Sequence, residues 1–186
     1  MRYRGFNIDP LATRHAPWRP AQCPSLPSFV DQGPMRKTVT QIIEADQWSL
    51  AEGLHNDKPL LIRYRSGFSS KPDVSAYPVL IRVTWPFATD STGMPDSSSS
   101  DAMATFEDRL VSAVEPTQDA ALVAVITNDG QREWLFYTSS AQEFGRRLTD
   151  MPQEEERYPI SLTLETDPDW SVLHENLLAG VKGTTD

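Results

Sequence analysis

Apolar and polar residues alternate in a series of short runs between residues 48 and 165, a pattern typical of β-strands. We expect six strands, at residues 48–53, 58–65, 78–85, 120–127, 131–138 and 158–165. The fourth run is apolar almost throughout, which indicates a strand buried on both faces in the middle of a sheet. Asn and Asp between the first two runs, and Asp129 and Gly130 between the fourth and fifth, predict hairpin turns.

Three other segments show the features of helices. One apolar face recurs at intervals of three and four residues and ends before Pro116: Met103, Phe106, Leu110 and Val114. A shorter helix follows the capping sequence at residues 139–143, with Phe144 and Leu148 facing inward. Asp167 followed by proline predicts the start of a C-terminal helix. The residues expected to dock that helix are Trp170, Leu173 and Leu177.

The order of these elements predicts an α+β fold. From the third strand onward it is strand, helix, strand, strand, helix, strand, the ferredoxin-like split βαβ arrangement (βαββαβ). In that arrangement two helices cover one face of an antiparallel sheet. We expect the N-terminal hairpin to extend the sheet, a short helix to end the domain, and the second face of the sheet to be uncovered.

The first 40 residues differ in composition from the rest. Six prolines fall within residues 1–34, and their spacing disfavours regular structure. We therefore predict a disordered or extended, proline-rich, basic extension at residues 1–40, a single α+β domain at residues 41–180 and a frayed tail at residues 181–186. An alternative for the extension is a basic arm that docks on the acidic domain or on a partner.

Residues 1–40 and residues 41–186 differ in net charge, and this difference disfavours some classes of function. The chain has 17 basic and 26 acidic side chains. Residues 1–40 hold six of the basic and two of the acidic ones. Residues 41–186 therefore hold 11 basic and 24 acidic side chains, a net charge of −13. Such a domain is unsuited to broad phosphate neutralisation, which disfavours nucleic acid and anionic membranes as partners. The chain has no long apolar run and no apolar secretory core, so we expect a cytoplasmic protein.

Catalytic motifs are missing from the sequence. It contains no glycine-rich phosphate loop, metal-ligand pair or nucleophile elbow, and we expect no metal and no cofactor. His55 precedes Asp57 in a turn, where a solvated role is favoured over proton transfer. Glu107 and Asp108 are favoured as a solvated helix face over an acid/base pair. The only cysteine, Cys23, excludes an intrachain disulfide.

One face of the predicted sheet offers candidate binding residues. If the helices cover the face that holds Leu60, Ile62, Val79, Ile81 and Val83, three arginines point to the other face, beside aromatic residues of the fifth strand. The five candidates are Arg63, Arg65, Arg82, Trp134 and Tyr137. Aromatic and arginine side chains on such a face can stack RNA bases. Because the domain is strongly acidic, we favour a protein contact, or simply local pairing of the arginines with Glu52, Glu133 and Glu165.

Several segments together resemble a known family. They are WSLAEG at residues 48–53, KPLLIRYR at 58–65, VTWP at 83–86, FEDRL at 106–110, TNDG at 127–130, REWLFY at 132–137 and DPDW at 167–170. In this order they are similar to the bacterial family catalogued as domain of unknown function 695, over residues 47–175. That family has no established activity, so the resemblance implies no catalytic residues. Such domains are sometimes joined to one similar to regulator of ribonuclease activity B, a ferredoxin-like protein that inhibits an RNA-degrading enzyme by binding it.

Two functions stay open from the sequence. The favoured one is a non-catalytic, acidic module that binds another protein, with basic proteins among the candidates, and regulates or neutralises it. The alternative is a small hydrolase or anion-binding enzyme. It would use carboxylates or His55, with Arg63, Arg65 or Arg82 holding an anion.

Overall fold

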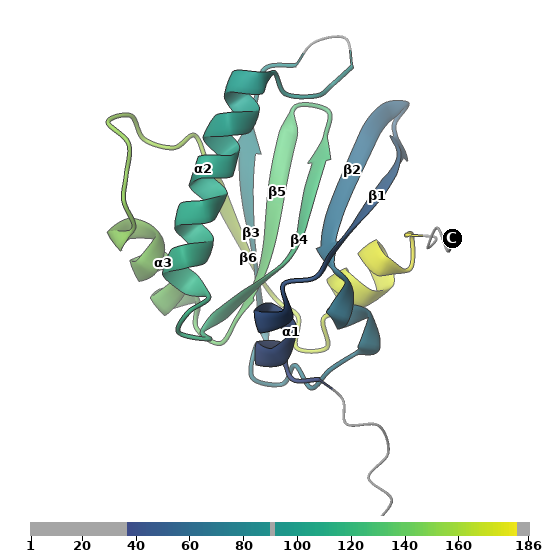
Figure 1. Cartoon of the computed structure of the whole chain (residues 1–186), viewed down its shortest axis with the longest axis vertical. Helices are drawn as coiled ribbons and strands as arrows, with labels where there is room; N and C mark the ends of the chain where they lie inside the picture. Colours follow the sequence, from purple (N-terminus) through teal and green to yellow (C-terminus); the bar gives the residue numbers. More distant parts are fainter. Residues whose placement is uncertain (1–36, 90–91, 182–186) are drawn as a thin grey trace, which may run out of the picture. The chain divides into compact units, whose positions relative to one another are not determined.

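The computed structural model describes residues 37–89 and 92–181 of the chain (Figure 1). Within these residues six strands form one sheet: β1 (Trp48–His55), β2 (Lys58–Arg65), β3 (Val79–Pro86), β4 (Ala120–Asn128), β5 (Gln131–Thr138) and β6 (Ser161–Thr166). The helices are α1 (Val39–Ala45), α2 (Ser97–Val114) and α3 (Ala141–Asp150), with a 3₁₀ helix η1 (Ser66–Ser70) and a π-helix η2 (Val172–Leu178). None of the helices in this part of the chain combines the length and the hydropathy of a membrane span.

The strands lie in the order β1-β2-β4-β5-β3-β6, and every neighbouring pair is antiparallel. The predicted α+β class and antiparallel sheet are therefore confirmed. β5 lies between β3 and β4, the insertion that gives a split βαβ unit its name. The β1–β2 hairpin extends the sheet beside β4, and β1 and β6 form its two edges.

Helix α2 buries the face that its sequence predicts. Met103, Phe106, Leu110 and Val114 are all fully buried. The N-cap is Asp96, whose carboxylate accepts a hydrogen bond from the amide of Ser99 at 2.7 Å, and the serines that follow form the first turn.

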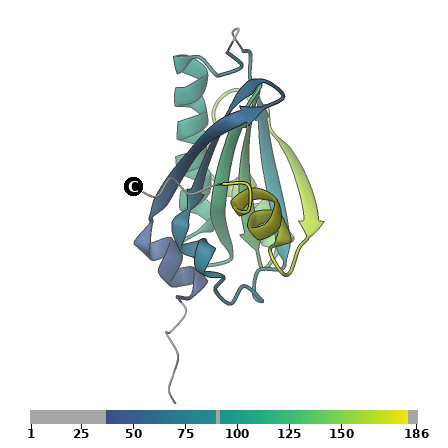
Figure 2. The same ribbon diagram turned by 90° about the vertical axis from the view of Figure 1, so that its right-hand side faces the viewer.

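The sheet is covered on both faces, so the expectation of an uncovered face is wrong. Helices α2 and α3 pack on one face, while α1, η1 and η2 pack on the other. Figure 2 shows α2 (teal) and η2 (yellow) on opposite sides of the sheet. The reason lies in β4, where Ala121 and Val123 join one core cluster and Leu122 and Val125 the other. A strand that is apolar on both faces needs cover on both.

Helix α1 was not predicted. Thr38 and Gln41 form a capping box at its start, and Val39 and Ile42 are buried against the second face. The helix thus begins just before residue 41, where the sequence predicted the domain to start. The rest of the predicted extension and residues 182–186 of the predicted tail lie outside the described residues.

A buried ion pair joins β2 to the end of α2. The guanidinium of Arg65 donates to the carboxylate of Glu115 at 2.8 Å, and both side chains are buried. Glu115 also accepts from the amide of Leu122 on β4 at 2.9 Å. Burial raises the pKa of the Glu115 carboxyl, and the charge of Arg65 acts against that shift. One carboxylate therefore connects two strands and a helix.

We predict that Glu115→Ala lowers the free energy of unfolding by about 3–5 kcal/mol, because it removes the buried counter-ion of Arg65. The exposed carboxylate of Asp46, 3.5 Å away, is then the partner that remains among the described residues. Chemical denaturation with a circular dichroism readout measures this loss. The control is Asp150→Ala, which removes an exposed partner of Arg146 and is expected to cost less than about 1 kcal/mol. A Glu115→Ala loss no larger than that of the control would show that the pair does not stabilise the fold.

Candidate binding groove

The position of η2 depends on one buried carboxylate. Asp167 accepts hydrogen bonds from the backbone amides of Ser171 at 2.8 Å and Val172 at 3.0 Å, which satisfies the first turn of the helix. It also accepts from the hydroxyl of Tyr137 on β5 at 2.6 Å. The predicted helix start at Asp167 and Pro168 is wrong, because η2 begins at Val172 with Ser171 as its N-cap. The Asp167 carboxylate nevertheless binds the first amides of the helix and attaches it to the sheet.

Trp170 fixes the helix in a second way. Its ring stacks on that of Tyr137 with 4.0 Å between centroids and 13° between planes. Its indole nitrogen donates to the carbonyl of Tyr77 at 2.9 Å, and Phe68 of η1 contacts it from the side. Because Trp170 is fully buried, η2 has a fixed place on the sheet.

The charge of Asp167 is held by these bonds. Burial acts to raise the pKa of its carboxyl, but the hydrogen bonds from Tyr137, Val172 and Ser171 outweigh burial and keep that pKa below the ordinary value of 3.8. The pKa of Tyr137 is raised, first by burial and then by its hydrogen bond to Asp167. At neutral pH the pair is therefore a neutral phenol that donates to a carboxylate.

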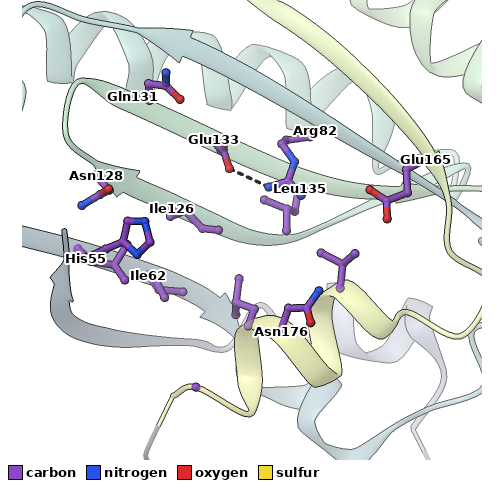
Figure 3. A pocket seen from close by; sticks show the side chains of 14 residues that line it. His55, Ile62, Arg82, Ile126, Asn128, Gln131, Glu133, Leu135, Glu165 and Asn176 are labelled. Carbon is purple, nitrogen blue, oxygen red and sulfur yellow. Dashed lines mark hydrogen bonds and ion pairs between the residues drawn. The ribbon is translucent and has the colours of Figure 1, made fainter.

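A groove of about 600 Å³ lies between η2 and the sheet (Figure 3). Its floor is apolar and consists of Leu60, Ile62, Ile126 and Leu135. Polar side chains border the floor: His55, Arg82, Asn128, Gln131, Glu133, Glu165 and Asn176. Asn176 belongs to η2 and faces the sheet across the groove. An apolar floor with a polar border is the usual composition of a ligand site.

The groove has an excess of negative charge. Arg82 donates to Glu133 at 2.9 Å, so these two charges compensate each other. Among the described residues no salt bridge involves Glu165, which lies on β6 at one end of the groove. A ligand in the groove therefore meets one carboxylate that has no cationic partner.

Three of the five predicted binding residues lie on the α2 face. Arg63 donates to the carboxylate of Glu107 on α2, and Trp134 donates to the same carboxylate at 2.7 Å. Arg65 pairs with Glu115, and both arginines also lie over the ring of Trp48. Glu107 is therefore engaged by two donors from the sheet and is not the solvated residue that the sequence predicted.

The other two predicted residues, Arg82 and Tyr137, lie on the groove face, so the expected common face for all five is wrong. Directly paired residues share a face, and the pairing connects Arg63 through Val125 and Trp134 to Val83. Arg82 is adjacent to Val83 and therefore points the other way. Of the five, Arg82 lines the groove, and a binding role for any of them stays a prediction.

The histidines are separate from one another. His55 lines the groove at its β1 end, and His174 lies on η2. The pKa of His174 is lowered, mainly by burial and then by the charge of Lys71. Within residues 37–89 and 92–181 no group of three or more His, Cys, Asp or Glu side chains is placed to hold a metal ion. His15 and Cys23 lie outside the described residues.

Sequence reasoning missed most of the groove. Leu60 and Ile62 were predicted to lie under the helices of the split βαβ unit, but they face η2 instead. A hint was present in the alternation of β5, where Gln131, Glu133 and Leu135 share one face. Polar residues followed by an apolar one indicate a face that leads from solvent to core.

The variant Asp167→Ala tests whether this carboxylate holds η2 on the sheet. Hydrogen bonds to a charged group contribute about 1.5–3 kcal/mol, so we expect the amides of η2 to exchange hydrogen roughly 10- to 100-fold faster. The expected pH effect has a definite sign: because the folded pKa is lowered, the stabilisation is present at neutral pH and is lost as the pH falls below 3.8. Hydrogen exchange with mass spectrometry measures the exchange rate of these amides and its dependence on pH. The control is Asp169→Ala, a substitution of an exposed aspartate. Equal exchange in the two variants would contradict the assignment.

Comparison with known proteins places the chain in a family. The model of a family of unknown function, DUF695, matches residues 46–178. No curated protein and no solved structure matches the chain. The matched range covers the whole sheet, from β1 to β6, the helices α2 and α3, and the whole of η2. The chain therefore belongs to the DUF695 family.

Proposed function

We propose that this domain is a non-catalytic binding module that takes an extended segment of another protein into the groove and thereby regulates or neutralises that protein. The observation that carries the proposal is the course of the groove. Its lining runs across the whole sheet, from His55 on β1 to Glu165 on β6. A site of that length suits a chain-like ligand.

The dimensions of the sheet support an extended segment. The order β1-β2-β4-β5-β3-β6 has five intervals between neighbouring strands, and at about 4.8 Å each they span about 24 Å. An extended polypeptide rises about 3.3 Å per residue, so about seven residues cross the groove. The floor lies on paired strands, so it is rigid before the ligand arrives, which lowers the entropic cost of binding.

The chemistry of the groove supports a segment with apolar and basic side chains. Leu60, Ile62 and Ile126 are half-buried and offer apolar surface that a ligand can cover. Glu165 offers a carboxylate to a lysine or arginine at the β6 end. The net charge of −13 over residues 41–186 attracts a basic partner before contact.

A selection of peptides tests the proposal. From a random library displayed on phage, we expect the full chain to select peptides in which two or three apolar residues lie near a lysine or arginine. Isothermal titration calorimetry then measures the affinity of one selected synthetic peptide. We predict that Glu165→Lys weakens it by at least tenfold, because attraction becomes repulsion, and that Ile126→Asp weakens it to a similar degree.

The matched control is Leu54→Asp, which places the same charge on an exposed leucine of β1 that is not among the residues lining this groove. We expect it to leave the affinity within a factor of two, and thermal unfolding of all three variants confirms that they fold. Selection of no consensus, or equal affinity in Ile126→Asp and Leu54→Asp, would refute the proposal.

A further inference from the structure

Strand β6 exposes apolar side chains at an edge of the sheet. Within the described residues it pairs only with β3, and all six of its residues are exposed. Leu162 and Leu164 are 40% and 57% exposed, on the face where α2 and α3 pack. Figure 2 shows this strand, in yellow-green, along the right-hand side of the sheet. Leu162 and Leu164, two of the apolar residues that alternate along this strand, are therefore not buried in the core.

Apart from the charged side chain of Glu165, this edge lacks the usual protection. Sheet edges are normally shielded by lysine, proline or a bulge, because an unpaired row of backbone groups invites another strand. Ser161–Thr166 contains neither lysine nor proline nor glycine, and its register with β3 runs without a shift. A regular six-residue edge with two exposed leucines suits pairing with another strand.

We propose that β6 pairs antiparallel with β6 of a second copy of this chain, about a two-fold axis at Thr163. In that register Leu162 of each copy lies opposite Leu164 of the other, so the two leucine pairs cover one another. Ser161 lies opposite Glu165, and no two like charges face each other directly. The two sheets then form one continuous sheet, with backbone hydrogen bonds between the copies.

The other edge of the sheet does not have this self-complementarity. β1 exposes Leu50 and Leu54, which are 63% and 73% exposed. The antiparallel register that joins those two leucines is centred on Glu52 and places it opposite Glu52 of the second copy. Like charges directly opposite destabilise a strand pair, and the adjacent Gly53 has no side chain to pack. The pattern therefore favours β6 over β1.

Analytical ultracentrifugation of the full chain over a concentration series tests the pairing. We expect a dimer that strengthens as salt is raised, because residues 41–186 carry a net charge of −13 and salt screens their repulsion. Leu164→Lys is expected to weaken the dimer at least tenfold, and the control Leu50→Lys to leave it unchanged. A monomer at every concentration and salt, or a dimer that Leu50→Lys breaks and Leu164→Lys does not, would overturn the proposal.

Cross-linking tests the register in the same protein. On a Cys23→Ser background, Thr163→Cys places two thiols directly opposite each other, at about 5 Å between Cβ atoms, within reach of a disulfide after small adjustment. With diamide as the oxidant we expect a covalent dimer on a non-reducing gel. Ser161→Cys is the control, because its opposite residue is Glu165 and no disulfide forms. Equal cross-linking of both variants, or none of Thr163→Cys, would refute this register.

Discussion

The hydrogen bond from Tyr137 to Asp167 is the interaction on which the groove depends. Without it the carboxylate still accepts from the first amides of η2, but the hydrogen bond that connects it to β5 is lost. With it, the carboxylate satisfies the backbone amides of the helix and holds the helix on the sheet at the same time. Trp170 stacks on Tyr137 and is the second contact that holds the helix on β5. The wall of the groove is therefore set by a neutral phenol, a carboxylate and one aromatic stack, all of them buried.

Two covered faces explain how an acidic domain with a single sheet holds together. β4 is apolar on both sides, and each side has its own core cluster. Two of the buried charges, Arg65 and Glu115, pair with each other. A third, Asp167, is held by the hydroxyl of Tyr137 and two backbone amides. Since most of the remaining carboxylates stay at the surface, the excess negative charge faces solvent. A groove with one uncompensated glutamate on such a domain is the basis for proposing a basic, partly apolar partner.

Most of the strands and helices could be predicted from the sequence. Which face of the sheet each side chain occupies could not. Alternation located five of the six strands, and a continuous apolar run located β4. The spacing from Met103 to Val114 identified the buried side of α2. Whether Arg63 and Arg82 share a face depends on three successive pairings, β2 with β4, β4 with β5 and β5 with β3. No single strand contains that information. Helix α1 was missed because its seven residues carry too short a repeat to stand out beside a proline-rich stretch.

Nuclear magnetic resonance of the full chain with isotope-labelled methyl groups tests the central claim most directly. A selected apolar and basic peptide is titrated into the protein, and the shifts of the leucine, isoleucine and valine methyl groups are followed. The account predicts that the largest changes fall on Leu60, Ile62, Ile126 and Leu135, which form the floor, and on Val172 and Leu177 of η2. Changes confined to the α2 face, around Leu61 and Val125, would contradict it.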